Sequence, residues 1–104
     1  ISSIEVEDAL YLHPAVMTCA VIARPDPKWG ETPLAIVETR PEQTPTDDAG
    51  REKLAAELIE HCRAHLARYK CPREIRFEAI PKTSTGKIQK HVLRQRIGSA
   101  GAIG

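Results

Sequence analysis

The chain has 104 residues, of which 41% are hydrophobic and 28% charged, and this length and composition predict one globular domain with a modest core. No apolar run approaches the 18 or so residues that a membrane-spanning helix requires, and no secretion leader is visible. The formal net charge is only +1, but residues 1–60 carry five basic and twelve acidic side chains, whereas residues 61–104 carry ten basic and two acidic ones. This basic second half predicts a phosphate-bearing partner. Because aromatic residues are scarce and no nucleic-acid-binding motif is present, a phosphorylated small molecule is favoured over nucleic acid.

The three cysteines, Cys19, Cys62 and Cys71, are odd in number and lack the spacing of metal ligands, so no metal site is predicted. Cys19 lies in an apolar run and Cys62 on a helix face, which is typical of small core residues in a reducing cytoplasm. The C-terminal residues 101–104 are not a peroxisomal targeting signal. The first residue is not methionine, so we expect a piece of a longer protein.

The first predicted element is a helix over residues 1–12. Ser2 and Glu5 have the spacing of a capping box at its start. The apolar residues expected to face the core are Ile4, Val6, Ala9 and Leu10. His13-Pro14 ends the helix, because the residue before a proline is disfavoured in the helical conformation.

Two strands are predicted next. Residues 15–23 are almost wholly apolar and rich in β-branched side chains, which indicates a strand buried on both faces. Residues 34–39 form the second strand, and the proline-rich residues 24–33 between them predict a long turn, so that the two strands make a hairpin. Trp29 lies in this turn, where it either covers the end of the hairpin or offers a flat face to a purine.

Residues 41–46 predict a loop whose prolines exclude regular structure, and a long helix is predicted over residues 46–67. Its apolar positions fall on one face, the pattern of a helix packed on a sheet: Leu54, Leu58, Ile59, Cys62 and Leu66. Three basic residues near its end, Arg63, Arg68 and Lys70, would stabilise the helix C-terminus by their charge.

The segment Tyr69-Lys70-Cys71-Pro72 closes the long helix, and the ring of Tyr69 would be half-buried there. Residues 75–79 alternate between apolar and charged, which indicates a half-exposed strand. Its predicted inward-facing residues are Ile75, Phe77 and Ala79. A final short helix is expected through Val92, Leu93 and Ile97, with a frayed end.

Residues 81–96, with the sequence PKTSTGKIQKHVLRQR, contain several basic side chains and no acidic one. Gly86 permits backbone angles closed to other residues, and Lys87 follows it directly. A phosphate-binding P-loop would need glycine in place of Pro81 and serine or threonine in place of Ile88, so that motif is absent. Two interpretations remain: a solvated basic turn before a helix, or a lysine delivered into an active site that lies mostly elsewhere.

The same stretch resembles the last motif of the acyl-adenylate-forming enzymes, which include acyl-CoA synthetases, peptide-synthetase adenylation domains and luciferases. The proline, glycine and lysine of residues 81–88 fall in register with that motif, as does the trailing Leu93-Arg94. Further similar segments are residues 1–7, residues 13–16, Trp29-Gly30-Glu31 and Tyr69-Lys70-Cys71-Pro72. The resemblance spans nearly the whole chain, but only the small C-terminal domain of such an enzyme.

The predicted elements form an α+β fold, in which a small three-stranded mixed sheet is flanked by one long and two short helices. If the second and third strands are neighbours, they run parallel and are joined by a right-handed crossover. The resemblance supports this architecture. It also implies that residues 1–104 form the mobile C-terminal domain of a larger enzyme, and that a large N-terminal domain precedes it.

The resemblance implies that the whole enzyme activates a carboxylic acid with ATP and Mg²⁺ to an acyl-adenylate, and then transfers the acyl group to CoA in the cytoplasm, as in fatty-acid metabolism. The isolated chain would be inactive, since the large domain would bind ATP, Mg²⁺ and the acid. Two alternatives are transfer of the acyl group to a carrier protein and a free-standing binding module without catalysis. Residues 1–7 look more like a CoA ligase than a peptide synthetase, which favours CoA as the acceptor.

The resemblance further implies roles for single residues. Lys87 matches the family's catalytic lysine, whose ammonium group stabilises the negative charge that gathers as the carboxylate meets the α-phosphate. Thr83 and Gly86 would position this lysine. Three residues match places that contact CoA in some relatives: Trp29, Arg63 and Tyr69. Acetylation of Lys87 by a lysine acetyltransferase would remove the charge, and a deacetylase would restore it.

Overall fold

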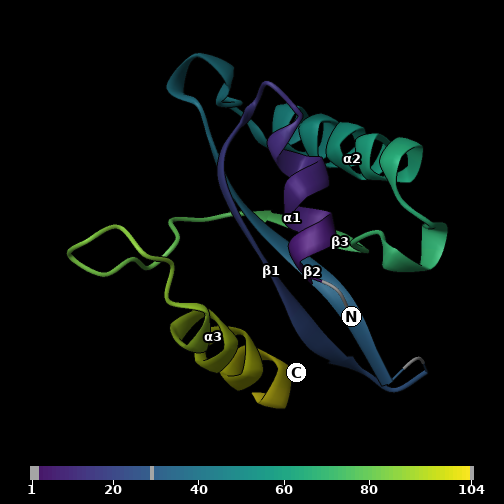
Figure 1. The fold of residues 1–104 in the computed structure, drawn as a ribbon, viewed down its shortest axis with the longest axis vertical. Helices are drawn as coiled ribbons and strands as arrows, with labels where there is room; N and C mark the ends of the chain where they lie inside the picture. The colour runs from purple at the N-terminus through teal and green to yellow at the C-terminus, as the bar shows by residue number, and fades with distance from the viewer. Residues whose placement is uncertain (1–2, 29, 104) are drawn as a thin grey trace.

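The computed structural model of the chain describes residues 3–28 and 30–103, with side chains as far as residue 97. In chain order the elements are α1 (Ser3–Tyr11), β1 (Val16–Asp26), β2 (Gly30–Thr39), a 3₁₀-helix (Pro41–Gln43), α2 (Asp48–His65), a second 3₁₀-helix (Arg68–Lys70), β3 (Glu74–Phe77) and α3 (Lys90–Ile103) (Figure 1). The predicted α+β fold is therefore confirmed. The last helix is longer than expected, and the capping box proposed at Ser2 lies outside the described residues.

The three strands form one mixed sheet in the order β1-β2-β3. β1 and β2 pair antiparallel from Val16–Thr39 to Asp26–Gly30, whereas β2 and β3 pair parallel from Leu34–Glu74 to Val37–Phe77. The predicted parallel pairing of the second and third strands is thus confirmed. The central strand of the sheet is β2.

The long turn predicted over residues 24–33 is wrong, because β1 continues to Asp26 and β2 begins at Gly30. Pro25 pairs with Glu31 inside the ladder. An edge strand accepts a proline, since the missing N–H can fall on the side that needs no partner, and the proline-rich composition therefore misled the prediction.

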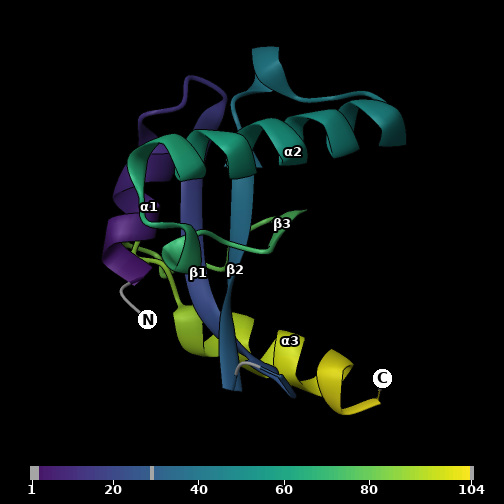
Figure 2. The same ribbon diagram turned by 90° about the vertical axis from the view of Figure 1, so that its right-hand side faces the viewer.

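Apolar residues cover both faces of the sheet, as the pattern of residues 15–23 predicted. Cys19, Val21 and their neighbours on β2 pack on one face against α1 and α2. Ala20 and Ile22 alternate with them and pack on the other face against α3. Because successive side chains of a strand point to opposite faces, one pair of strands fills two cores. Figure 2 shows α2 and α3 at opposite ends of this arrangement, with the sheet between them.

Two residues expected to face inward are exposed. Ile4 has an exposed fraction of 68%, because it lies on the side of α1 opposite Val6 and Leu10, whose spacing of four residues sets the buried stripe. Ala79 is exposed because β3 ends at Phe77, and the alternation of the strand ends with it. Ile80 is buried instead.

The long helix α2 buries the predicted face, and it is slightly shorter than the predicted range 46–67. The side chain of Asp47 accepts a hydrogen bond from the Gly50 amide at 2.7 Å, which satisfies a free N–H group of the first turn. Leu58 and Cys62 are buried, and Leu54, Ile59 and Leu66 pack against the same core. Regular structure does occur just after β2, since Pro41 begins a 3₁₀-helix, a position where its missing N–H costs nothing.

Side chains of α1 satisfy the outer edge of β1. The Tyr11 hydroxyl accepts from the Cys19 amide at 3.2 Å and lies 3.4 Å from the Cys19 carbonyl oxygen, to which it donates. The Glu7 carboxylate accepts from the Val21 amide at 2.8 Å. Two side chains of α1 therefore occupy hydrogen-bonding groups of β1 that a fourth strand would otherwise pair with.

Candidate functional site

The predicted loop before α3 is a small β-hairpin formed by residues 82–88, which we call the lysine hairpin. Lys82 and Ile88 form an antiparallel bridge, and the Thr83 amide donates to the Lys87 carbonyl oxygen at 2.8 Å. Next to the bridge, the Gln89 amide donates to the Pro81 carbonyl oxygen at 2.9 Å. In Figure 1 this hairpin projects from the body of the domain.

A tight turn at the tip of the lysine hairpin sets the backbone before Lys87. The Gly86 amide donates to the Thr83 carbonyl oxygen at 2.9 Å, and Gly86 has a φ of +88°, a conformation that favours glycine. No atom lies within 4 Å of a Cβ built there, so the backbone angle rather than space requires glycine. The Thr83 hydroxyl oxygen accepts from the Lys87 amide at 3.1 Å. The functional role of Thr83 and Gly86 stays a prediction.

The Lys87 ammonium group is exposed and, among the described residues, forms no ion pair, in contrast to the lysines on either side of it. Lys82 pairs with Glu38 at 2.7 Å, and Lys90 pairs with Glu7 at 2.8 Å. An unpaired ammonium group on a projecting, ordered turn can bind an anion supplied by another molecule or domain. Its catalytic role in this chain stays a prediction.

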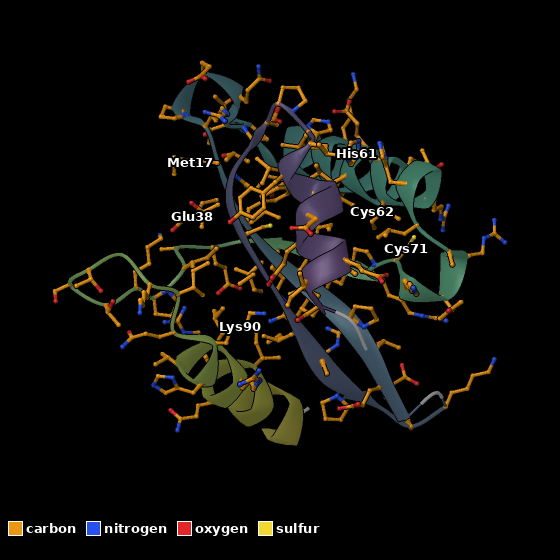
Figure 3. The ribbon with its side chains drawn as sticks, in the orientation of Figure 1. Met17, Glu38, His61, Cys62, Cys71 and Lys90 are labelled. Carbon is orange, nitrogen blue, oxygen red and sulfur yellow. The ribbon has the colours of Figure 1, made fainter. Side chains whose placement is uncertain are left out.

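Sequence reasoning missed Glu38, which lies at the base of the lysine hairpin. Its carboxylate accepts from the Ile80 amide at 2.8 Å and from the Lys82 ammonium group at 2.7 Å. Burial alone would raise the pKa of the Glu38 carboxyl, but these bonds hold the pKa below its ordinary value. No local pattern marks this residue, because its partners lie more than forty positions along the chain. Figure 3 shows Glu38 on the side of the molecule from which the hairpin projects.

A second basic region surrounds a hollow of about 440 Å³ at the exit from α2, and we call it the arginine hollow. It is lined by Arg63, Arg68, Tyr69 and Arg73, with Cys71 at its floor. The structure thus brings together Arg63 and Tyr69, two of the three residues predicted to contact CoA. The third, Trp29, lies outside the described residues.

Two expectations about the residues of this region are corrected. The Tyr69 side chain, which lies in the second 3₁₀-helix, has an exposed fraction of 81%, so the alternative of a half-buried ring at the helix end is wrong. Lys70 lies beyond the end of α2 and pairs with Glu5 of α1 at 2.7 Å, so it joins two elements instead of stabilising the helix terminus. Arg63 does lie in the last turn of α2 and pairs with Glu60 at 2.5 Å on the surface.

The cysteines are free thiols and all three are buried, as predicted for Cys19 and Cys62. Burial raises the pKa of Cys19 to about 12 and that of Cys62 to about 11, so both stay protonated and unreactive at neutral pH. Within residues 3–28 and 30–97, whose side chains are described, no group of three or more His, Cys, Asp or Glu could hold a metal ion. No helix in the described part of the chain is long and apolar enough to cross a membrane.

Comparison with known proteins confirms the resemblance noted in the sequence. A family model described as the AMP-binding enzyme C-terminal domain matches residues 5–87. The chain is 47% identical over 103 residues to the acetate–CoA ligase CCL3 of Humulus lupulus, an alignment that covers 99% of this chain and 18% of that protein. It is 43% identical over 103 residues to the peroxisomal acetate/butyrate–CoA ligase AAE7 of Arabidopsis thaliana, with 99% and 18% covered. The acyl-CoA synthetase of Brucella canis superposes with a TM-score of 0.85 at 37% identity, over 97% of this chain and 18% of that one. The chain therefore spans less than a fifth of the length of these relatives.

Proposed function

Because the chain belongs to the family of AMP-binding enzyme C-terminal domains, we propose that residues 1–104 are the mobile C-terminal domain of an ATP-dependent acyl-CoA ligase. In the proposed reaction a carboxylate attacks the α-phosphate of ATP, which gives an acyl-adenylate and releases pyrophosphate. The CoA thiol then attacks the acyl carbon, which gives the thioester and releases AMP. The observation that carries the proposal is the exposed Lys87 ammonium group, which forms no ion pair with any described residue and directly follows the Gly86 turn, at the end of the segment that matches the family.

Lys87 would act in the first half-reaction. Negative charge gathers on the carboxylate and the α-phosphoryl oxygens as they approach, and a fixed ammonium group stabilises that charge most in the transition state. The hydrogen bonds of the Thr83–Gly86 turn hold the Lys87 backbone, so the point from which the ammonium group extends is set before the substrates meet. Mg²⁺ would enter with ATP as part of the substrate, held by the large N-terminal domain.

A separate domain explains how one site can serve two reactions. When the lysine hairpin withdraws after adenylate formation, the volume it occupied becomes open to the second substrate. The projection of the hairpin from the domain body supports this proposal, since the lysine can enter a partner surface without the core following it (Figure 1).

We assign the arginine hollow to the nucleotide end of CoA in the second half-reaction. A volume of about 440 Å³ falls in the range of small-molecule sites. The exposed Tyr69 ring offers a face for the adenine, and the Arg63 guanidinium can bind a phosphate through two parallel hydrogen bonds. Its ion pair with Glu60 is exposed, and such pairs contribute at most about 1 kcal/mol, so a phosphate can replace it. Trp29 is proposed as a second aromatic contact to CoA.

CoA is favoured over a carrier protein as the acyl acceptor, because the relatives named above are CoA ligases. Those two relatives are named for acetate and butyrate, so short-chain acids are the first substrates to test, with longer fatty acids as a comparison. We place the enzyme in the cytoplasm, a proposal that the three free thiols support. Exposure of Lys87 supports reversible acetylation as a control on the first half-reaction.

The full-length enzyme that contains this chain provides the test. Purified enzyme with ATP, Mg²⁺, CoA and each acid should release pyrophosphate and AMP and form the acyl-CoA thioester for at least one acid. The 104-residue chain alone should form none of these products. Turnover by the 104-residue chain, or a full-length enzyme that releases phosphate instead of pyrophosphate, would contradict the proposed function.

A further inference from the structure

The base of the lysine hairpin is held by a carboxylate where the sheet ends. β3 pairs with β2 only as far as Phe77 and Val37, and the chain then leaves the sheet. Glu38 is the next residue of β2 and has no partner on β3. Its side chain reaches the departing chain instead, because Oε2 accepts from the Ile80 amide at 2.8 Å and Oε1 accepts from Lys82 Nζ at 2.7 Å.

These two bonds fix both a backbone group and a side chain at the start of the hairpin. Ile80 is buried with Leu93 in the core under α3, so apolar packing already holds its side chain inside the domain. Apolar packing has little directional preference, whereas a carboxylate with both oxygens engaged constrains orientation. Glu38 therefore determines the direction in which the chain leaves the sheet. The Lys82 ammonium group also lies 3.4 Å from the Ile80 carbonyl oxygen, which closes the same small network.

The hairpin transmits that orientation to its tip. The Lys82–Ile88 bridge, the Thr83–Lys87 bond at 2.8 Å and the Gly86 turn make it a single unit with few free torsions. A rotation at its base would therefore move the whole hairpin, and Lys87 with it. The Glu38 side chain has an exposed fraction of 16%, so water competes weakly for its two bonds.

The Glu38 carboxyl is ionised at neutral pH. Burial raises its pKa, but the bonds from Ile80 and Lys82 outweigh that effect and lower the pKa below its ordinary value. Two described side chains bond to this carboxylate, one charged and one neutral. Lys82 pairs with it, and Thr18 of β1 contributes a hydroxyl. The next carboxylate along the chain that leads to the hairpin, Glu78, lies 3.9 Å from Arg96 of α3.

We infer that Glu38 is a positioning residue for Lys87, and that its bonds to Ile80 and Lys82 hold the lysine hairpin in the orientation that adenylate formation requires. The inference rests on the proposed function, since it assigns a role in the half-reaction in which Lys87 acts. Glu38 touches no substrate in this account. It acts through the hairpin.

Glu38→Gln in the full-length enzyme tests the inference, with Glu74→Gln as the matched control. The control removes a carboxylate of the same sheet that pairs with Arg24 and Arg76 at 2.5 and 2.7 Å, and neither arginine belongs to the hairpin. Three quantities would be measured: acid-dependent pyrophosphate release, thioester formation from presynthesised acyl-adenylate, and deuterium exchange of the peptide that covers residues 79–89. Since a misplacement of about 1 Å can cost roughly a hundred-fold in rate, we expect pyrophosphate release to fall about ten- to a hundred-fold in Glu38→Gln.

The expected pattern is selective. Thioester formation should stay within about two-fold of the wild type in both variants, and exchange of residues 79–89 should accelerate only in Glu38→Gln. A second variant, Lys82→Gln, should reproduce part of the loss, and the double variant should lose less than the two single effects combined predict, because both changes break one network. Equal loss of both half-reactions, or the same loss in Glu74→Gln, would assign Glu38 to general stability. Faster exchange with unchanged pyrophosphate release would also overturn the inference.

Failure of the proposed function gives a different result. If Lys87→Ala leaves pyrophosphate release intact, the lysine has no part in the first half-reaction and the proposed function is wrong. If Lys87→Ala abolishes the release while Glu38→Gln is silent, only the positioning role of Glu38 is wrong.

Discussion

The lysine hairpin and the arginine hollow are both cationic, but they present charge in opposite ways. Lys82 of the hairpin pairs with Glu38, and Lys90 at the start of α3 pairs with Glu7. The Lys87 ammonium group at the tip has no ion pair with a described residue. In the hollow, three guanidinium groups and one aromatic ring line a common surface. One charge carried by a backbone that directional hydrogen bonds hold suits a transition state of fixed geometry, whereas several charges around an open hollow suit a mobile, polyanionic ligand. Substitutions in the hairpin and in the hollow should therefore affect different half-reactions.

The largest effect is expected at the hairpin. Lys87→Ala in the full-length enzyme should reduce acid-dependent pyrophosphate release by about a hundred- to a thousand-fold, since loss of a charge that acts in the transition state costs a few kcal/mol. Thioester formation from presynthesised adenylate should change little. Single-turnover assays of the two half-reactions measure both quantities. Comparable damage to both would place Lys87 in the fold or in CoA binding.

A smaller effect is expected at the turn before the lysine. Gly86→Ala places a side chain at φ +88°, which costs roughly 1–2 kcal/mol, so we expect pyrophosphate release to fall about ten-fold. Ser84→Ala is the matched control, because Ser84 is exposed in the same turn and no residue other than glycine in the described chain has a positive φ. A Gly86→Ala enzyme as active as the control would show that the turn conformation is unimportant.

The hollow should show the reverse selectivity. Arg63→Ala and Tyr69→Ala should each raise the apparent KM for CoA several-fold, since an exposed phosphate or stacking contact contributes about 1 kcal/mol. Pyrophosphate release should be nearly unchanged. Raising the ionic strength should weaken CoA binding in the wild type more than in Arg63→Ala, because the guanidinium–phosphate attraction is screened. An unchanged KM in both variants would remove the hollow from the CoA site.

The smallest effect concerns acid. Burial raises the pKa of Glu38 and of Glu74, but hydrogen bonds outweigh it and lower each pKa below the unfolded value: those from the Ile80 amide and Lys82 for Glu38, and those from two arginines for Glu74. Such groups stabilise the fold fully above the unfolded pKa, and this contribution is lost as the pH falls through the folded pKa. Between pH 7 and pH 3 the melting temperature should therefore fall less in Glu38→Gln and Glu74→Gln than in the wild type. The difference should be only a few degrees. Identical slopes in wild type and both variants would mean that neither pair persists in solution.

The sequence predicted the sheet, the long helix and the lysine because each has a local signal. Apolar runs at 15–23 and 34–39 determine strands that are buried on both faces, and the spacing of Leu58 and Cys62 determines the buried side of α2. The β1–β2 hairpin is longer than predicted, because prolines, which usually end a strand, are accepted in this ladder.

Contacts between distant residues had no such signal. In the sequence, nothing distinguishes Glu38 from any other polar residue at a strand end. Only the fold places it next to Ile80 and Lys82. Likewise, the hairpin geometry of residues 82–88 depends on one bridge and a few hydrogen bonds that residue composition does not encode. The family resemblance predicts a role for Lys87, but the network at the base of its hairpin became visible only in three dimensions.

The contacts of α1 with β1 have a consequence for handling the domain outside its enzyme. Tyr11 and Glu7 occupy the hydrogen-bonding groups of Cys19 and Val21 on the open edge of the sheet. A fragment that begins after residue 12 would expose this edge, and an exposed strand edge with apolar side chains recruits strands from other molecules. Such a shortened fragment should precipitate or form β-rich aggregates. A soluble fragment of this domain should therefore keep the nine residues of α1.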